Sequence, residues 1–516
     1  MRLSAWRRSA VLDRSLYPTR AEESVAAELS AVRPSLDAAY AAALPGARAA
    51  VLTRLWRGLA HDPLPWVRAR EETRDGLTLR LADGSRLHGP LPDPYATDAY
   101  VDQVELDGVP YRQPARLVTA LGVAHATEFA VELDDSTASL ALSRAGRGPV
   151  RPDLWPDAGW QWEQRVVDGH PYHPNCRSRP GFTVAEQLAY APEHGPVVEL
   201  GVVPVPPREC LVAGDWPREL RDGDRILVPV HPWQARHVLK SPVEPGTAAH
   251  PLMALRTLAP AGGGGPHVKT ALSTRLTSSV RDMSVYSVEN AEAVSAFVES
   301  LAARLEGRLH ITRTVGAVSA YTPDLAALLR EPPERFADAE RGERVVPVAA
   351  LTTTDLVRSA SWLADFARLA LTVCLRVLEL GVALEAHGQN LLVVLGPDGA
   401  PLRLVYRDLA DIRISPARLG RHGIAVPPIA GRMVTDDVAV LRRKLFGSLV
   451  SGALGATAGS AAALGAALAA AAPALPPGPD REALVARPLP VKALTLMRLS
   501  PGVPGDLWTE VANPLG

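Results

Sequence analysis

One polar stretch, Glu385-Ala-His-Gly-Gln-Asn390, combines a carboxylate, an imidazole and an amide on a predicted tight turn. An apolar run over 391–395, the turn signal Gly396-Pro-Asp-Gly399 and a second apolar run over 402–406 then lead to Asp408. This order is typical of a β-hairpin, which would return Asp408 to the end where Asn390 lies. An amide oxygen and a carboxylate there could hold Mg²⁺ on nucleotide phosphates, as the same pair of residue types does in protein kinases.

Three cations lie among hydroxyl residues further upstream. Arg256 precedes the glycine run 262–265, and Lys269 and Arg281 follow it. The run is not a P-loop, because that motif needs glycine directly before its lysine and Val268 is there instead. Cations among Ser and Thr are typical of polyanion recognition, and a triphosphate and a polycarboxylate are both candidates.

The same segment carries a structural expectation. Alternation over 268–276 predicts one strand with Lys269 and Arg275 on the same face, and a solvated edge strand is the simpler alternative. We expect a turn or the start of a helix near Thr277. On a helical turn, Thr277 and Arg281 would share one face and suit a carboxylate.

Two further motifs are polar. Gly169-His-Pro-Tyr-His-Pro174 has two histidines, but proline after each one extends the chain, which argues against a zinc site. We interpret it as a rigid polar turn near a cleft. His231-Pro-Trp-Gln234 follows an apolar run over 225–230 and, taken alone, indicates a strand end with a packed Trp.

These residues need a large framework. A chain of 516 residues predicts two or three domains. We divide it into residues 1–150, which mix helices with short strands, a strand-rich region 151–345, and a helical region 346–516. Within it we expect helices over 21–40, 47–60 and 353–380, and strands over 77–81 and 100–106.

Composition excludes some classes of function. The net charge of −1, without a basic stripe, argues against nucleic acid as a partner. Three distant cysteines, Cys176, Cys210 and Cys374, fit a reducing compartment. The first twenty residues lack the apolar core of a secretory signal. The Ala/Gly-rich stretch 452–476 lacks the apolar density and anchors of a membrane span, so we expect a packed helix there.

Taken in order, the motifs carry a family likeness. The chain resembles the IucA/IucC family of NRPS-independent siderophore synthetases over residues 160–500. The matching residues are Gly169 to Pro174 with Arg179, Gly181 and Phe182, then His231 to Gln234, Arg256 to Leu258, Lys269, Thr277, Ser278, Arg281, Glu385 to Asn390, Arg407, Asp408, Lys492 to Leu494 and Met497 to Leu499.

The resemblance implies an α+β fold shaped as a cupped hand of thumb, fingers and palm, the palm being distantly kinase-like. It implies a cytoplasmic ligase that adenylates a carboxylic acid with ATP and Mg²⁺ and passes the acyl group to an amine or alcohol. Arg281, His387 and Lys269 would be catalytic. ATP would contact Arg256, Thr257, Lys269, His387, Asn390 and Asp408, the carboxylate substrate would contact Thr277, Arg281 and His387, and Mg²⁺ would bind Glu385, Asn390 and Asp408.

Departures from the family pattern leave the substrates open. Ala254 replaces a common Ser, Arg177 a Lys, and Arg313 begins a stretch where an acid is common. Citrate, citryl or succinyl amides and 2-oxoglutarate are candidate acids, and amines such as hydroxylated diamines or amino acids are candidate nucleophiles. A homodimer is also implied, whereas residues 1–150 match no motif.

Two rival functions come from other classes. A small-molecule phosphotransferase would share His387, Asn390 and Asp408, but such enzymes have Asp directly after His-Gly, where this chain has Gln389. Gln cannot accept the proton of an attacking hydroxyl. A non-catalytic carboxylate-binding protein would leave Glu385, Asn390 and Asp408 without a role.

Overall fold

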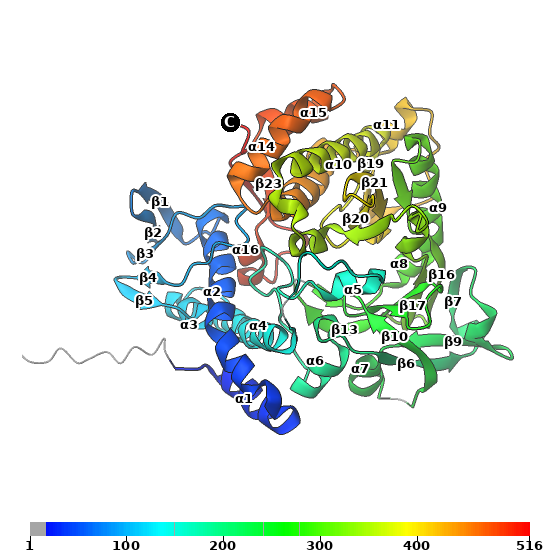
Figure 1. Cartoon of the computed structure of the whole chain (residues 1–516), viewed down its shortest axis with the longest axis horizontal. Helices are drawn as coiled ribbons and strands as arrows, with labels where there is room; N and C mark the ends of the chain where they lie inside the picture. The colour runs from blue at the N-terminus through cyan, green and yellow to red at the C-terminus, as the bar shows by residue number, and fades with distance from the viewer. Residues whose placement is uncertain (1–16, 149, 241, 278) are drawn as a thin grey trace, which may run out of the picture.

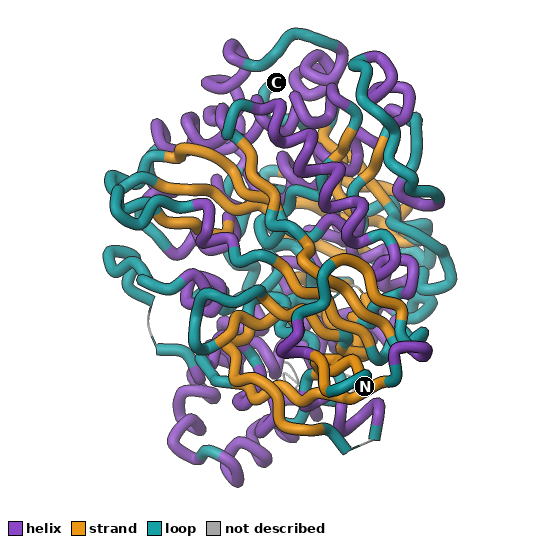
Figure 2. The backbone as a smooth tube through the Cα atoms, turned by 90° about the vertical axis from the view of Figure 1, so that its right-hand side faces the viewer, coloured by secondary structure: helices purple, strands orange, loops and turns teal. Residues whose placement is uncertain are grey.

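Three groups of elements follow one another along the chain and occupy different sectors of the molecule (Figure 1). The computed structural model describes residues 17–148, 150–240, 242–277 and 279–516, so most of the stretch tested for a secretory signal lies outside the described residues. Helices are combined with mostly antiparallel sheets, which confirms the predicted α+β class. Strands dominate the lower half of the view in Figure 2, and helices dominate its upper part.

The first group is a helical layer beside a five-stranded sheet. Its elements are α1 (Arg20–Val32), α2 (Asp37–His61), β1 (Val67–Thr73), β2 (Gly76–Leu81), β3 (Arg86–Gly89), β4 (Val104–Leu106), β5 (Val109–Tyr111), α3 (Pro114–Leu121) and α4 (Ala126–Gly146). The predicted helices over 21–40 and 47–60 are wrong in their bounds. The break comes at Arg33, because Pro34 disfavours helical backbone in the residue before it, and α2 continues through Pro45.

The second group is built on a nine-stranded sheet with the order β7-β16-β17-β12-β11-β10-β6-β9-β8. Its strands are β6 (Val198–Val205), β7 (Leu211–Gly214), β8 (Arg221–Asp222), β9 (Arg225–Val230), β10 (Glu244–Pro251), β11 (Thr257–Pro260), β12 (His267–Thr270), β16 (Thr314–Ser319) and β17 (Ala326–Arg330). Helices α5 (Gly159–Gln164), α6 (Val184–Tyr190), α7 (Pro232–Gln234), α8 (Val285–Glu289) and α9 (Ala291–Ala302) accompany it.

The single strand predicted over 268–276 is wrong. The chain leaves the nine-stranded sheet at Ala271, and β13 (Leu272–Leu276) pairs instead with β14 (Ser279–Arg281) in a separate hairpin. Lys269 is therefore buried, whereas Arg275 is exposed. The predicted turn at Thr277 is present, with φ 60°. It is the tip of this hairpin and not a helical turn, because Arg281 pairs with Leu272 across the ladder.

The third group surrounds a long buried helix, α10 (Ala360–Leu380). Its other elements are β19 (Val382–Ala383), β20 (Leu391–Leu395), β21 (Pro401–Tyr406), β22 (Arg413–Ile414), α11 (Pro416–Arg421), α12 (Val438–Leu445), the π-helix Phe446–Leu454, α13 (Gly455–Ala458), α14 (Ala461–Ala471), α15 (Pro479–Ala486), β23 (Leu489–Lys492), α16 (Leu494–Leu499) and β24 (Trp508–Val511). The helix begins later than the predicted residue 353, because the Ser359 side chain caps it by accepting from the Trp362 N–H.

Contacts between the groups are extensive. A four-stranded sheet pairs β15 (Leu309–Ile311) and β18 (Arg344–Pro347) with β20 and β21, and so joins strands from both sides of residue 345. The Asp62 carboxylate at the end of α2 accepts the N–H groups of Thr495 and Leu496. The division at residues 150 and 345 stays a prediction.

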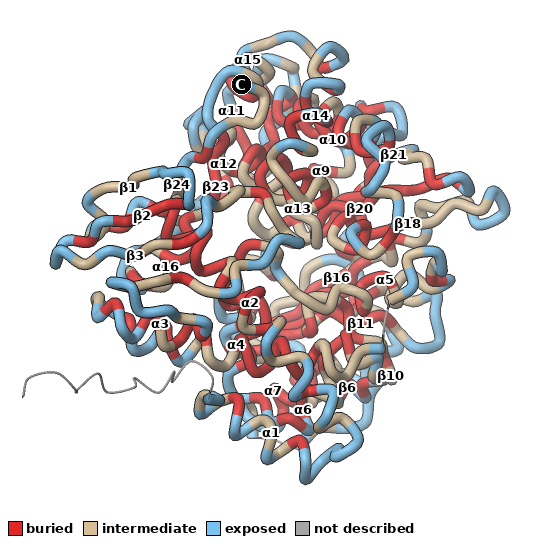
Figure 3. The backbone as a smooth tube through the Cα atoms, turned by 60° about the vertical axis from the view of Figure 1, so that its left-hand side comes forward, coloured by how far each residue is buried: buried red, intermediate tan, exposed pale blue. Residues whose placement is uncertain are grey.

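The Ala/Gly-rich stretch forms two helices where the sequence predicted one. Gly459, with φ 76°, ends α13, and Ser460 caps α14. Among the described residues, no single helix is long and apolar enough to cross a bilayer, and the pair Val438–Ala458 and Ala461–Ala474 is bent by 117°. Figure 3 shows most of α10 as buried. Helix α10 shares one core with the π-helix, α14 and the four-stranded sheet, including Phe366, Leu449 and Leu464.

Candidate active site

The polar loop 385–390 begins where α10 and β19 end, and it forms a tight turn around His387. The His387 carbonyl accepts the N–H groups of Asn390 and Leu391 at 2.9 and 3.0 Å. The Gln389 N–H donates to the Nδ1 atom of His387 at 3.3 Å. An acceptor at Nδ1 assigns the proton of neutral imidazole to Nε2. Burial lowers the pKa of His387, which keeps the ring neutral near pH 7.

The predicted hairpin returns Asp408 to this loop. The Arg407 N–H donates to the Asn390 carbonyl at 3.0 Å, and the β20–β21 ladder pairs Leu391 with Tyr406. Asp408 has a left-handed backbone with φ 69°, which is uncommon for a residue other than glycine or asparagine. The sequence prediction that Asn390 and Asp408 share one end of the hairpin is therefore confirmed.

Cations from the nine-stranded sheet meet Asp408. The Nζ atom of Lys269 lies 2.7 Å from one carboxylate oxygen, and the guanidinium of Arg330, at the end of β17, lies 3.5 Å from the other. Burial alone would raise the pKa of Asp408, but Lys269 and Arg330 outweigh that effect and hold it well below its usual range. Burial also lowers the pKa of Lys269 to about 7, although Asp408 opposes the shift.

Arg256 links the sheet to the β13–β14 hairpin. Its guanidinium donates to the carbonyl of Asp282 at 2.8 Å and also to the carbonyl of Arg281. Arg281 itself donates to the Leu276 carbonyl at 3.0 Å, which closes the hairpin. Burial lowers the pKa of Arg281, and the charges of Asp408 and Glu385 oppose that shift, so both acids act on it electrostatically.

The predicted residues thus divide into two sets. Lys269, Asp408, Arg256, Arg281, Glu385, Asn390 and His387 come together around the junction of the sheet with the hairpin. Thr257 lies opposite Lys269 in the ladder and is buried. Thr277 lies at the tip of the β13–β14 hairpin, half-buried, and no hydrogen bond of its side chain joins it to the others among the described residues.

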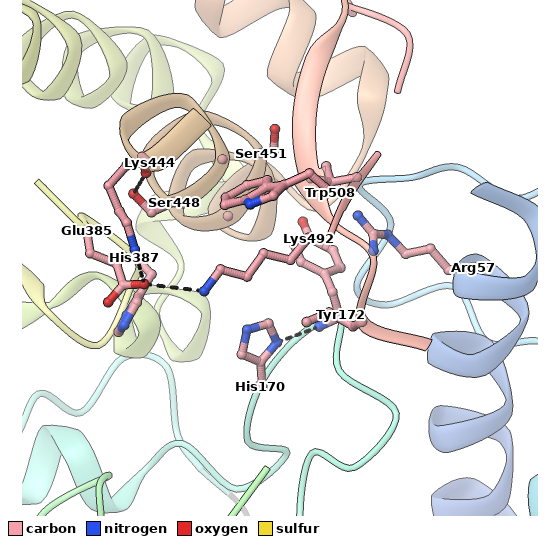
Figure 4. Close-up of a pocket in the computed structure, with 14 residues that line it drawn as sticks. Arg57, His170, Tyr172, Glu385, His387, Lys444, Ser448, Ser451, Lys492 and Trp508 are labelled. Atoms are coloured by element: carbon pink, nitrogen blue, oxygen red, sulfur yellow. Dashed lines mark hydrogen bonds and ion pairs between the residues drawn. The ribbon is translucent and has the colours of Figure 1, made fainter. Parts of the chain in front are cut away.

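A polar pocket of about 90 Å³ lies beside His387 (Figure 4). Its walls come from all three groups of elements and comprise Arg57, His170, Tyr172, Glu385, His387, Lys444, Gly447, Ser448, Ser451, Gly452, Val491, Lys492, Leu494 and Trp508. His170 belongs to the His-Pro motif, whose interpretation as a polar turn near a cleft is confirmed. The Oε1 atom of Glu385 lies 3.1 Å from Lys444 and 3.4 Å from Lys492.

Sequence reasoning missed Arg330, Lys444 and Arg57. Arg330 ends an apolar strand, 326–330, and a charged residue at the end of a buried strand was the available signal. Lys444 and Arg57 lie in helices whose sequences carry no comparable signal. The motif His231-Pro-Trp-Gln234 has the structural role expected, since the His231 side chain accepts the Trp233 N–H and Trp233 is buried.

The predicted magnesium ligands lie close together but already have partners. Carboxylate and amide oxygens suit Mg²⁺ in type. Glu385, Asn390 and Asp408 supply them from one loop and the adjoining strand end, where Asn390 donates to the Glu385 carbonyl at 3.5 Å. Each carboxylate already faces two cations in the described part of the chain, so phosphate groups would have to draw Lys269 away before Asp408 could bind a metal ion.

Two protein-family models match separate parts of the chain. Residues 159–353 match the model of the IucA / IucC family. This part of the chain, which holds the nine-stranded sheet, is therefore similar to the IucA/IucC family. A second model, described as ferric iron reductase FhuF-like transporter, matches residues 360–503, which run from α10 past α16.

Curated relatives match this chain over part of their length. It is 23% identical over 370 residues to a D-ornithine–citrate ligase of Staphylococcus aureus, covering 57% of this chain and 56% of that protein. It is 24% identical over 312 residues to a citryl-spermidine/3,4-dihydroxybenzoyl-citryl-spermidine:spermidine ligase of Bacillus anthracis. The alignment covers 48% of this chain and 50% of that protein. The chain spans about half the length of the curated relatives it matches.

Solved structures match nearly the whole fold. The petrobactin biosynthesis protein AsbB from Bacillus anthracis aligns with a TM-score of 0.76 at 19% identity, over 93% of this chain and 98% of that one. The ATP-bound aerobactin synthetase IucA from Klebsiella pneumoniae aligns with a TM-score of 0.67 at 20% identity, over 91% of this chain and 99% of that one. At these identities the likeness establishes the fold.

Proposed function

We propose that this protein is an ATP-dependent ligase that activates a carboxylic acid as its adenylate. The acyl group is then transferred to an amine or alcohol, with release of AMP and pyrophosphate. The observation that carries the proposal is the contact of Lys269 with Asp408 at 2.7 Å. There the cations of the nine-stranded sheet meet the end of the hairpin that begins beside His387, whose side chain lines the polar pocket.

In the first step, a carboxylate oxygen of the substrate attacks the α-phosphorus of ATP and forms a new P–O bond. The bond between the α-phosphorus and the bridging oxygen breaks, and pyrophosphate leaves with its electron pair. Arg256, Thr257 and Lys269 would bind the phosphates. Fixed cations stabilise the charge that develops on the leaving group, and no covalent enzyme group is needed.

In the second step, the amine nitrogen or alcohol oxygen attacks the acyl carbon of the adenylate. The bond between the acyl carbon and the phosphate oxygen breaks, AMP leaves with its electron pair, and the proton of the nucleophile passes to water. Thr277 and Arg281 would bind the carboxylate of the substrate before it is activated. The Nε2–H of His387 is directed by the Nδ1 contact with Gln389, so His387 would donate a hydrogen bond to the acyl or α-phosphate oxygen.

Glu385, Asn390 and Asp408 would hold Mg²⁺, which when bound supplies neutralisation of phosphate charge. The Lys269 side chain would turn from Asp408 to a phosphate as ATP enters. Because Asp408 retains Arg330 as a partner, its carboxylate stays ionised in either arrangement.

The substrates are proposed by analogy with the relatives. The names of two relatives give citrate with ornithine and a citryl compound with spermidine. We expect a polycarboxylic acid such as citrate, or a citryl or succinyl derivative, and a small amine or alcohol. The three groups of elements would be the thumb, the fingers and a distantly kinase-like palm. We expect a cytoplasmic enzyme, with a homodimer as its assembly, and no nucleic-acid or membrane partner.

A phosphotransferase is less well supported. Gln389 stands where such enzymes carry their catalytic Asp, and its main chain is engaged by His387 and Arg407. Asp408 cannot replace that base, because Lys269 and Arg330 hold its pKa well below its usual range.

A panel of carboxylic acids tests the proposal. Each acid is mixed with the protein, ATP, Mg²⁺ and hydroxylamine as a surrogate nucleophile, and pyrophosphate and hydroxamate are measured. One polycarboxylic acid should raise pyrophosphate release at least about tenfold above the acid-free rate, and Lys269→Ala should abolish the increase. If no acid raises it while circular dichroism shows a folded protein, the proposal is wrong.

A further inference from the structure

Arg57 reaches the polar pocket from the N-terminal group of elements, which carried no functional motif. It lies on α2 and lines the pocket beside His387. It also lines an adjoining pocket of about 180 Å³ between α2 and the 90–101 segment, and Tyr172 is the other side chain that both pockets share. In Figure 4, Arg57 and His387 lie on opposite sides of the pocket.

The other cations of this pocket already have acidic partners. Lys444 lies 3.1 Å from Glu385 and 2.6 Å from Asp411. Lys492 lies 3.4 Å from Glu385 and 3.0 Å from Asp506. These two lysines therefore carry little free charge to offer a ligand.

Arg57 has no such partner among the residues that the structure describes. Its Nε–H donates to the Pro94 carbonyl at 2.6 Å, and its guanidinium carbon lies 4.3 Å from the centre of the Tyr172 ring. No carboxylate of a described residue forms an ion pair with it within 4.0 Å, although the charges of Asp62 and Asp93 act on it from a longer distance. Its two terminal amino groups make no hydrogen bond within the described chain. The side chain is nonetheless buried, with 8% of its surface exposed.

A buried cation without a counter-ion destabilises a protein unless a ligand neutralises it. The contacts at Nε and at the Tyr172 ring fix the plane of the guanidinium and leave its terminal amino groups free. That arrangement suits a carboxylate, which accepts two parallel hydrogen bonds from an arginine fork. The neighbouring pocket gives space beyond the fork for the rest of a substrate.

We propose that Arg57 binds a carboxylate of the substrate on the side of the pocket opposite His387. The inference rests on the proposed ligase function and extends it, because it gives residues 1–150 a direct part in substrate recognition. The carboxylate belongs either to an amino-acid nucleophile or to the arm of a polycarboxylic acid that is not activated. Both sources share one chemistry, and the arms of the experiment distinguish them.

The first arm varies the nucleophile. Ornithine and 1,4-diaminobutane differ only in the carboxylate, so the ratio of their kcat/KM values measures its recognition. If the nucleophile carries the group, the wild-type ratio favours ornithine and Arg57→Gln lowers it about tenfold or more. The second arm varies citrate with hydroxylamine as nucleophile. If the acid carries the group, Arg57→Gln raises the KM for citrate about tenfold or more, and the KM for ATP changes far less.

Arg54→Gln is the matched control. Arg54 lies three residues before Arg57 on α2 and lines the neighbouring pocket but not the pocket beside His387. It donates hydrogen bonds to the carbonyls of Asp168 and His170. Arg54→Gln should change the kcat/KM values for ornithine and for 1,4-diaminobutane by the same factor. Arg54→Gln could remove the preference for ornithine over 1,4-diaminobutane as Arg57→Gln does. The position of the segment around Asp168 and His170, and not Arg57, would then cause that preference, and the proposal would be wrong.

Binding without turnover separates this proposal from the ligase function. Calorimetric titration of citrate and of ornithine, without ATP, compares the wild-type protein with Arg57→Gln and Arg57→Lys. At least one of these carboxylates should bind about tenfold more weakly to Arg57→Gln than to the wild-type protein. Its affinity for Arg57→Lys should lie between these two values. If both carboxylates bind equally well to wild type and Arg57→Gln, or bind to neither, Arg57 is not a carboxylate site. A failed acid panel would contradict the ligase function alone.

Discussion

Asp408 is the residue on which the account depends most. It ends the hairpin strand, adopts a left-handed backbone, and pairs with Lys269 and Arg330 from the nine-stranded sheet. Its proposed role as a metal ligand places its charge next to the reacting phosphates.

Asp408→Asn should lower acid-dependent pyrophosphate release at least about a hundredfold, because a metal ligand acts directly on transition-state charge. It also leaves two buried cations without their partner, so thermal unfolding should begin at a lower temperature. Activity is therefore compared at a temperature where circular dichroism shows both proteins folded. Glu343→Gln is the control. It breaks the ion pair of Glu343 with Arg403, which lies on β21, the strand that leads to Asp408, and neither residue lines the pocket. Near-normal pyrophosphate release by Asp408→Asn at saturating Mg²⁺ would contradict the ligand assignment.

Asp62 gives a pH-dependent prediction. Burial raises the pKa of Asp62 to about 7, although the N–H groups of Thr495 and Leu496 oppose the shift. The folded state then binds more protons than the unfolded state between about pH 4 and pH 7, so the contribution of Asp62 to stability falls as the pH rises through that window. Asp62→Asn should therefore gain stability relative to wild type on going from pH 4 to pH 8, by at most about 4 kcal/mol. Urea unfolding of both proteins at these pH values measures it, and a constant difference would contradict it.

At the scale of elements, one buried ion pair joins three segments of the site. Glu163 on α5 accepts two hydrogen bonds from Arg407, at 2.6 and 3.0 Å, and also the Met253 N–H at 3.0 Å. Arg407 precedes Asp408, and Met253 lies three residues before Arg256. The pair therefore fixes the Arg256 loop relative to the end of the hairpin.

Glu163→Gln should destabilise the protein by about 3 kcal/mol or more, because it leaves the buried Arg407 charge without a counter-ion. Adenylation should fall as well, with a larger effect on the KM for ATP than on the KM for the acid. Thermal unfolding and steady-state kinetics measure both effects. Glu379→Gln, which breaks an exposed pair with Arg376, should hardly change either. Equal unfolding temperatures for the two variants would contradict this role.

Elements set by local sequence were predictable. The hairpin 391–406 carries its own turn signal, so its register and the return of Asp408 to Asn390 followed from nearby residues. The segment 268–276 was predicted wrongly because its break at Ala271 depends on which sheet each half joins. The helical turn proposed for Thr277 failed for the same reason, since the pairing of β13 with β14 decides it.

At the scale of the whole molecule, the pocket is assembled from residues between Arg57 and Trp508. Helix α2, the 169–174 turn, the 385–390 loop and β23 all contribute side chains. Arg57 and Lys444 were not predictable as site residues, because their positions depend on packing between elements hundreds of residues apart. The motifs that were recognised carry the residues that we propose for ATP and acid activation, and Arg57 and Lys444 line the pocket beside them.

The identity of the nucleotide product distinguishes an adenylating ligase from a phosphotransferase. Turnover of ATP with the preferred acid and amine is followed by chromatography, and AMP, ADP, pyrophosphate and phosphate are counted. A ligase that forms an acyl-adenylate yields AMP and pyrophosphate in equal amounts, one of each for every amide or ester formed. ADP as the main nucleotide product, with phosphate on the acid or the amine, would contradict it.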